Sequence, residues 1–204
     1  MLREIKDRIL GIPWVYDVLR PLAAGGIDFA ALATFCATKP CERIFDLGCG
    51  TGQLLSYLKF GAYLGVDLDP SALRRAARHT APNARFVQGD HWDELYRELK
   101  PDVALMIGVV HHLSDDAFRL LAGRMLASES LRRIVAVEVT CVPGRWLNNL
   151  LSRLDRGGFV REPAGYESLF ARSGLRVVRR ELLPTRLRYV LYVGYHLEPA
   201  RGPG

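Results

Sequence analysis

Hydrophobic residues occur in short runs that alternate with amphipathic stretches over most of the chain. Five runs have the length of buried β-strands, at residues 43–47, 63–67, 85–88, 103–107 and 133–138. Stretches with helical periodicity separate these runs, at residues 51–60, 70–80, 92–99 and 115–126. Strands that alternate with helices in this way predict crossover units and a parallel sheet.

The two ends of the chain follow different patterns. Residues 1–40 carry apolar side chains at helical intervals and are interrupted by prolines and a Gly-Gly pair, which predicts short helices. Residues 175–183 and 187–197 are strand-like, and the three residues between them allow only an antiparallel pair. The expected fold is therefore α/β, a doubly wound, seven-stranded, mostly parallel sheet with a C-terminal antiparallel hairpin.

A glycine-rich turn follows the first predicted strand, with Gly48, Gly50 and Gly52 at alternate positions. Such a turn lets a ligand approach backbone N–H groups at the start of a helix. Gln53 replaces the last glycine of a G-x-G-x-x-G dinucleotide motif, and no P-loop Gly-Lys-Ser/Thr is present. Asp46, just before the turn, repels a pyrophosphate and favours a cationic ligand.

Two further acids follow the next two strands of the predicted sheet. Asp67 ends the second strand, where a carboxylate can accept hydrogen bonds from both hydroxyls of a ribose. Asp90, with His91 beside it, follows the third strand at the same sheet edge. Together with the glycine turn, these acids predict a pocket of adenosine size.

The chain resembles the class I S-adenosylmethionine-dependent methyltransferases in four motifs that occur in order within residues 42–138. These motifs are Asp46–Gly52, Gly65–Pro70, Phe86–Asp90 and Gly108–Leu113. The resemblance implies the Rossmann-like methyltransferase fold, S-adenosylmethionine as cofactor, and transfer of its sulfonium methyl group. It also implies the cofactor-binding residues, which are Asp46, Gly48, Cys49, Gly50, Gly52, Asp67, Leu68, Asp90, His91, Gly108 and Val109.

The same resemblance gives these residues their roles. Asp46 and the glycine turn would hold the methionine moiety, and Asp67 would bind the ribose hydroxyls. Leu68 would pack on the adenine and Asp90 would lie by its amino group. Gly108 and Val109, after the fourth strand, would line the channel to the methyl group.

Residues on the acceptor side point to a hydroxyl. Relatives that methylate amides or bases usually carry an Asn/Asp-Pro-Pro-Tyr turn after the fourth strand, and this chain has His111 and His112 there instead. An imidazole suits the removal of a hydroxyl proton near neutrality, and we expect His112 rather than His111 to do so. Alignment of the acceptor with an already activated methyl can also suffice without a base.

The domain organisation follows from these assignments. We expect one domain over residues 1–198 and a flexible tail over 199–204. Its expected parts are a helical cap (1–40), a cofactor-binding core (42–138), a substrate-side insert (139–166), and a C-terminal helix and hairpin (167–198). Acceptor selection is expected from outside the core, at Trp14, Tyr16, Trp146 and Arg153.

Composition narrows the function further. The 204 residues carry a formal net charge of +6, and the four cysteines show no spacing of a metal site. The absence of an apolar run of 18 residues and of an export signal predicts a cytoplasmic protein without membrane insertion. We expect O-methylation of a small molecule in sugar, lipid or natural-product biosynthesis. The alternatives are an RNA methyltransferase, disfavoured by the lack of an RNA-binding module, and a non-catalytic cofactor-binding protein.

Overall fold

The structure is a computed structural model that describes residues 26–79, 81–89, 92–154, 157–186 and 190–200. Four of the expected site residues, Trp14, Tyr16, Asp90 and His91, therefore lie outside the described residues. Most of the expected helical cap and of the expected tail lies outside them as well.

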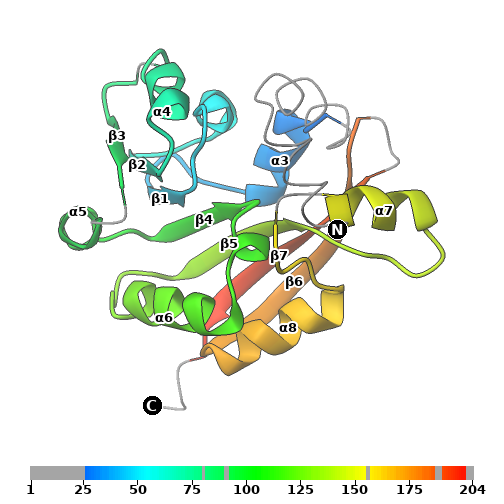
Figure 1. Ribbon diagram of the computed structural model, residues 1–204. Coiled ribbons are helices and arrows are strands. Elements are labelled where there is room, and N and C mark those ends of the chain that lie inside the picture. The colour runs from blue at the N-terminus through cyan, green and yellow to red at the C-terminus, as the bar shows by residue number, and fades with distance from the viewer. Residues whose placement is uncertain (1–25, 80, 90–91, 155–156, 187–189, 201–204) are drawn as a thin grey trace.

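Within the described residues, the centre of the fold is a seven-stranded sheet with the order β3-β2-β1-β4-β5-β7-β6 (Figure 1). The strands are β1 (Arg43–Leu47), β2 (Ala62–Asp67), β3 (Ala84–Gln88), β4 (Val103–Ile107), β5 (Arg133–Val139), β6 (Leu175–Pro184) and β7 (Leu191–Pro199). β1 to β5 pair in parallel, and β7 pairs antiparallel with both β5 and β6. The expected parallel sheet and C-terminal hairpin are confirmed.

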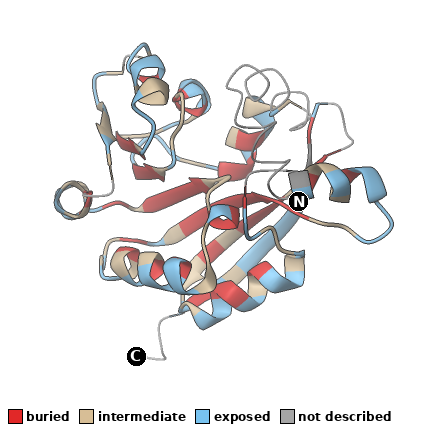
Figure 2. Cartoon of the chain, viewed as in Figure 1, coloured by how far each residue is buried: buried red, intermediate tan, exposed pale blue. Residues whose placement is uncertain are grey.

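Helices cover both faces of this sheet (Figure 1). The α-helices are α3 (Phe29–Cys36), α4 (Pro70–Ala76), α5 (Asp93–Leu99), α6 (Asp115–Leu126), α7 (Trp146–Leu154) and α8 (Pro163–Arg172). One hydrophobic core joins α5, α6 and α8 to one face, and a second joins α3 and the 3₁₀-helix η1 (Gln53–Tyr57) to the other. Because both faces are covered, the central strands are buried along nearly their whole length (Figure 2).

The helix starts agree with the capping residues in the sequence. The Asp69 side chain accepts from the Ser71 backbone N–H and is followed by Pro70 at the first position of α4. The Ser114 hydroxyl accepts from the Ala117 backbone N–H at the start of α6. Each cap satisfies a backbone donor that has no partner inside the helix.

The segment between β1 and β2 differs from the expected α-helix over residues 51–60. It forms only the five-residue 3₁₀-helix η1, which begins after Gly52 in the left-handed conformation and gives way to extended backbone at Leu58. The glycine turn uses up the start of this connection, and the chain must return at Gly61, whose N–H donates to the Glu42 carbonyl. Too few residues remain for an α-helix of ordinary length.

The expected boundaries near the C-terminus also shift. α8 begins at Pro163, before the expected boundary at residue 167, because a proline fits the first helical position. β7 is described from Leu191, and residues 187–189 of the expected strand lie outside the described residues. The substrate-side insert contains a helix of its own, α7.

The packing of β7 against α3 predicts a sharp difference between two glycines. A Cβ on Gly194 would lie 2.6 Å from ring atoms of Phe35, whereas a Cβ on Gly123, in α6, would meet no atom within 4 Å. We expect Gly194→Ala to destabilise the protein by about 1–3 kcal/mol through overpacking. Gly123→Ala should stabilise it by about 0.5–1 kcal/mol through helix propensity. Chemical denaturation of both variants measures this, and equal effects would contradict the packing.

Candidate active site

The glycine turn after β1 is pinned to the neighbouring strand β2. The backbone N–H groups of Gly48 and Cys49 both donate to the Val66 carbonyl, at 2.8 and 3.1 Å. Gly48, Gly50 and Gly52 all have positive φ angles, which side chains rarely adopt. A Cβ on Gly50 would meet no protein atom within 4 Å. The turn is therefore a fixed backbone cradle that stays open at Gly50.

Asp67, at the end of β2, ties this cradle to the start of α4. One carboxylate oxygen accepts from the Gly50 N–H at 2.7 Å, and the other accepts from the Asp69 N–H at 2.9 Å. These bonds orient the carboxylate at the sheet edge, and in the described part of the chain no cation pairs with it. Leu68, the next residue, has 71% of its surface exposed. A fixed carboxylate beside an exposed apolar side chain fits the ribose and the base of an adenosine.

Asp46 lies beneath the cradle and is almost fully buried, with 3% of its surface exposed. The Tyr63 hydroxyl donates to Asp46 Oδ2 at 2.6 Å. Burial raises the pKa of Asp46 to about 6, the Tyr63 hydrogen bond opposes that rise, and the Asp67 charge adds to it. At neutral pH the site therefore holds a buried negative charge.

Cys49 lies between these acids. Burial, followed by the charges of Asp46 and Asp67, raises the pKa of its thiol well above the ordinary value. The thiol therefore stays protonated and fills space in the turn, as a neutral side chain should in a cradle surrounded by carboxylates.

A second turn follows β4 and is organised by a carboxylate that the sequence analysis did not identify. Glu138, on β5, is fully buried. It accepts from three successive backbone N–H groups, those of Val109, Val110 and His111, at 2.8–3.1 Å. The His111 ring also bonds to Glu138, with 2.6 Å between Nδ1 and Oε2. Glu138 is the one acid within the apolar strand β5, and that was its only sequence signal.

The two expected catalytic histidines have different environments. His111 is buried, whereas His112 is exposed, and their ring centroids are 4.1 Å apart. Gly157, from the insert, packs so closely on His111 that a Cβ there would overlap the imidazole ring. The Phe159 N–H also donates to the His111 carbonyl at 3.0 Å. The insert therefore covers His111 and leaves His112 at the surface.

Arg161 fastens the insert to this loop and was also not identified from the sequence. Its guanidinium donates to the carbonyls of Leu113 and Phe159, at 3.0 and 2.7 Å, and to the Asp115 carboxylate at 2.7 Å. These partners belong to the insert itself, to the loop after β4 and to the start of α6. The insert and the histidine loop thus form one connected unit.

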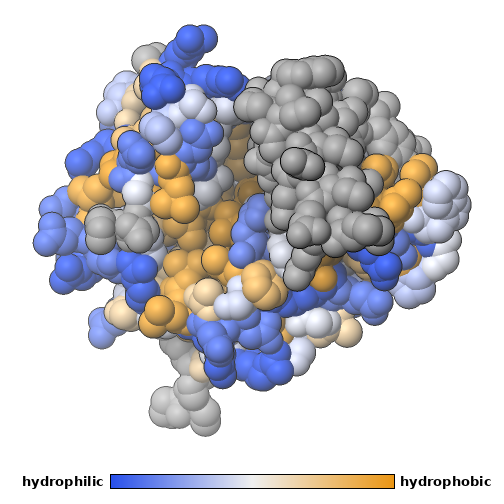
Figure 3. All heavy atoms as spheres, viewed as in Figure 1, coloured by the Kyte–Doolittle hydropathy of each residue, from blue (hydrophilic) through white to orange (hydrophobic). Residues whose placement is uncertain are grey.

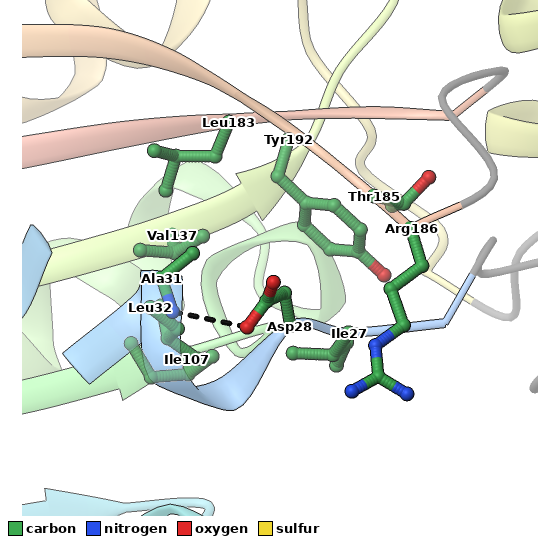
Figure 4. A pocket seen from close by; sticks show the side chains of 10 residues that line it. All are labelled: Ile27, Asp28, Ala31, Leu32, Ile107, Val137, Leu183, Thr185, Arg186 and Tyr192. Atoms are coloured by element: carbon green, nitrogen blue, oxygen red, sulfur yellow. Dashed lines mark hydrogen bonds between the residues drawn. The ribbon is translucent and has the colours of Figure 1, made fainter. Parts of the chain in front are cut away.

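A cavity of about 350 Å³ lies at the same sheet edge, on the α3 side (Figure 4). Its lining combines the ends of β4 and β5 with the start of α3 and with both strands of the hairpin. The lining residues are Ile27, Asp28, Ala31, Leu32, Ile107, Val137, Leu183, Thr185, Arg186 and Tyr192. Figure 4 shows the Asp28 carboxylate among mainly apolar side chains. Hydrophobic residues also gather beside α4 on the face of the molecule seen in Figure 3.

Trp146 and Arg153, the two expected acceptor residues that the structure describes, do not line this cavity. Trp146, at the start of α7, has 74% of its surface exposed, and neither it nor Arg153 belongs to the lining. The cavity residues carried no distinctive sequence motif. They come from five separate elements (α3, β4, β5, β6 and β7), which only the fold brings together.

Comparison with known sequences identifies relatives. A family model described as "Methyltransferase domain" matches residues 45–128. An uncharacterized methyltransferase of Synechocystis sp. is 30% identical over 186 residues, which cover 83% of this chain and 86% of the relative.

Solved structures share the fold at low identity. The 1,6-didemethyltoxoflavin-N1-methyltransferase of Burkholderia thailandensis aligns with a TM-score of 0.69 and 17% identity, over 97% of this chain and 88% of that one. The mitomycin 7-O-methyltransferase aligns with a TM-score of 0.62 and 22% identity, over 89% of this chain and 54% of that one.

The described residues contain no candidate membrane span and no candidate metal site. No helix in that part of the chain is long and apolar enough to cross a membrane. In the same residues, no group of three or more His, Cys, Asp or Glu side chains has an arrangement that could hold a metal ion.

The buried Asp46 predicts an unusual pH dependence of stability. Its pKa is 3.8 in the reference state and about 6 in the folded protein, so the folded state binds the proton more tightly. The ionised carboxylate therefore costs stability above pH 6, and this cost disappears as the pH falls towards 4. Asp46→Asn should stabilise the ligand-free protein at pH 8 by up to about 3 kcal/mol.

Denaturant unfolding of wild type and Asp46→Asn at pH 8 and pH 5 measures this difference. Asp102→Asn is the control of opposite sign, because hydrogen bonds from Arg43 lower the pKa of Asp102. That substitution should destabilise the protein by the same amount at pH 8 and pH 5, because a carboxylate with a lowered pKa loses its contribution only below the ordinary pKa of 3.8. A stability gain from Asp46→Asn that does not change between the two pH values would contradict the assignment.

Proposed function

The chain belongs to the class I S-adenosylmethionine-dependent methyltransferases, and we propose that it methylates a hydroxyl group of a small molecule. S-adenosylmethionine, the cofactor of this family, supplies a methyl group already activated on a sulfonium. One observation carries the proposal. The cradle after β1 and the histidine loop after β4 meet at Gly48, where a Cβ would lie 2.6 Å from Val109 Cγ2. Cofactor and proton acceptor would thus share one sheet edge.

The residues of the cradle fit the cofactor. Asp67 would accept hydrogen bonds from the ribose hydroxyls, because its orientation is already fixed by the Gly50 and Asp69 N–H groups. Exposed Leu68 would cover one face of the adenine. Asp46 would attract the ammonium group of the methionine moiety, since its negative charge has no ion-pair partner among the described residues.

His111 is the residue best oriented to accept the proton of the acceptor hydroxyl. Its Nδ1 is held by Glu138 at 2.6 Å, and a carboxylate beside an imidazole stabilises the imidazolium that forms when the ring takes up a proton. His112, exposed next to it, is the second candidate. The expectation from the sequence favoured His112, and the Glu138 bond is what now favours His111.

The cavity beside α3 is the proposed seat of the acceptor. Ile107, in its lining, immediately precedes the Gly108–His112 loop, so an acceptor that extends from the cavity would reach the loop. The mainly aliphatic lining favours a compact apolar compound over a polar sugar. The fold itself leaves the acceptor atom open, because its relatives include both an N- and an O-methyltransferase.

The arginines near the C-terminus do not favour an RNA substrate. A basic group of this kind would favour that alternative, but four of these arginines bind carboxylates in the structure. The ion pairs are Arg172–Asp115, Arg176–Glu198, Arg179–Glu181 and Arg180–Glu167. Arginines already paired in this way are less available to phosphates than a free basic stripe.

Cofactor binding is the first test of this function. The purified protein should bind S-adenosylmethionine in calorimetry, and Asp67→Ala or Gly50→Val should weaken binding by more than about 1.5 kcal/mol. Asp67→Ala removes the hydrogen-bond acceptor, and Gly50→Val fills the open cradle. Gly123→Ala, at an exposed position of α6, is the matched control and should bind normally. A folded wild type that does not bind would refute the proposal.

Turnover separates the two histidines. A panel of hydroxylated small molecules, with methylated products detected by mass spectrometry, should yield an acceptor. With it, His111→Gln should lower kcat by about 10²-fold or more, as expected for loss of a general base, and should leave cofactor affinity unchanged. The same loss in His112→Gln alone would assign the base to His112. Normal kcat in both variants would leave alignment as the source of catalysis. Cofactor binding without product from any acceptor would favour a non-catalytic role.

A further inference from the structure

Tyr63 is a strand residue whose hydroxyl group has an unusual partner. Its ring is buried between Phe60 and Phe86, with a distance of 5.7 Å between ring centroids on each side. A phenylalanine would fill the same apolar space. The hydroxyl, however, donates to the Asp46 carboxylate at 2.6 Å. Its partner is therefore the acid at the end of the neighbouring strand β1.

Among the described residues, no cation acts on Asp46 to explain its burial. The groups that act on it electrostatically are Tyr63 and Asp67, both from β2. Its own charge acts on Cys49 in the turn and on Cys36 in α3. None of these four groups can carry a positive charge, because phenol, carboxyl and thiol groups are either neutral or negative. In the described part of the chain Tyr63 bonds Oδ2, and Oδ1 accepts no hydrogen bond.

A buried carboxylate with one hydrogen-bond donor is only half satisfied. Charged groups in protein interiors normally have a partner of opposite charge or several hydrogen bonds, because removing them from water is costly. A phenol supplies a hydrogen bond without supplying positive charge. The negative charge of Asp46 therefore remains available to a cation that arrives with a ligand, next to the cradle at Gly48–Gly52.

We propose that Tyr63 is a positioning residue for the cofactor, which holds Oδ2 of Asp46 so that Oδ1 faces the ammonium group of S-adenosylmethionine. This inference rests on the proposed role of Asp46. A lysine or arginine in place of the phenol would neutralise the carboxylate and compete with the ligand. A phenylalanine would leave the carboxylate free to rotate and easier to protonate. Tyrosine avoids both effects.

Two ligands separate positioning from general damage to the site. S-adenosylhomocysteine carries the ammonium group, and 5′-methylthioadenosine has the same adenosine moiety without the amino acid. Tyr63→Phe should lower the affinity for S-adenosylhomocysteine about fivefold, as expected for the loss of one hydrogen bond, and leave the affinity for 5′-methylthioadenosine unchanged. Binding is measured by calorimetry, with competition for the weaker ligand. Tyr96→Phe is the matched control, because it removes a buried phenol that bonds the Met125 carbonyl away from the site.

The pH dependence gives a second readout. In wild type, affinity for S-adenosylhomocysteine should fall as Asp46 takes up a proton below about pH 6. Because the Tyr63 hydrogen bond stabilises the carboxylate anion, Tyr63→Phe should move that fall to higher pH. The titration of the ligand itself cancels in the ratio between variant and wild type. In an Asp46→Asn background, Tyr63→Phe should have no further effect on ligand affinity.

Each outcome decides one point. Tyr63 would be a purely structural residue if Tyr63→Phe lowered the affinity for both ligands equally. The same would follow if it lowered affinity as much in the Asp46→Asn background as in wild type. An unchanged affinity for S-adenosylhomocysteine, with an unchanged pH profile, would also overturn the inference. By contrast, a wild type that binds neither ligand would refute the proposed function. Normal binding by Asp46→Asn would refute the role of Asp46, and with it that of Tyr63, but would leave the proposed function standing.

Discussion

Two turns at the edge of the sheet are held by carboxylates that come from the neighbouring strand. Where a parallel strand ends, its backbone N–H groups lose their partners in the ladder and must find others. Asp67 of β2 takes the Gly50 N–H of the turn after β1, and Glu138 of β5 takes three N–H groups of the loop after β4. Both the cofactor cradle and the histidine loop depend on this exchange. Each turn is thus fixed across strands rather than by its own sequence.

This arrangement concentrates buried negative charge at one place in the fold. Asp46 and Glu138 are almost fully buried, and Asp67 lies next to Asp46. Apolar residues of similar size would usually serve stability as well or better. Counted over the described residues, Glu138 recovers part of its desolvation cost through four hydrogen bonds, whereas Asp46 has one. Asp46, the residue with the poorer compensation, is the one proposed to meet the cationic part of the ligand. A cost in stability is expected at such a residue, because its partner arrives only with the ligand.

The sequence predicted those features that depend on local pattern. The runs at residues 43–47 and 103–107 became β1 and β4 with the expected bounds, because buried parallel strands are continuously apolar. The prediction of an α-helix over residues 51–60 is wrong, because the connection is too short for the helix that its apolar periodicity suggests. From the sequence, Glu138 and Tyr63 are only strand residues. Their hydrogen-bond partners, His111 and Asp46, lie 27 and 17 positions away. Nothing in the local pattern indicates such a pair. Arg161 was missed for the same reason.

In the proposed function, the connection between the insert and the histidine loop would link acceptor choice to chemistry. Arg161 bonds the loop carbonyl of Leu113, and Gly157 packs directly on the His111 ring. A glycine is required at that contact because any side chain would displace either the insert or the imidazole. Insert residues that control the entry of an acceptor would therefore also determine whether the His111 imidazole can reach that acceptor. If His111 is the base, the insert cannot diverge freely to accept new substrates, because the segment around Gly157 must keep the shape of the imidazole. Divergence would then fall on α7 and on the cavity beside α3, which make no such contact.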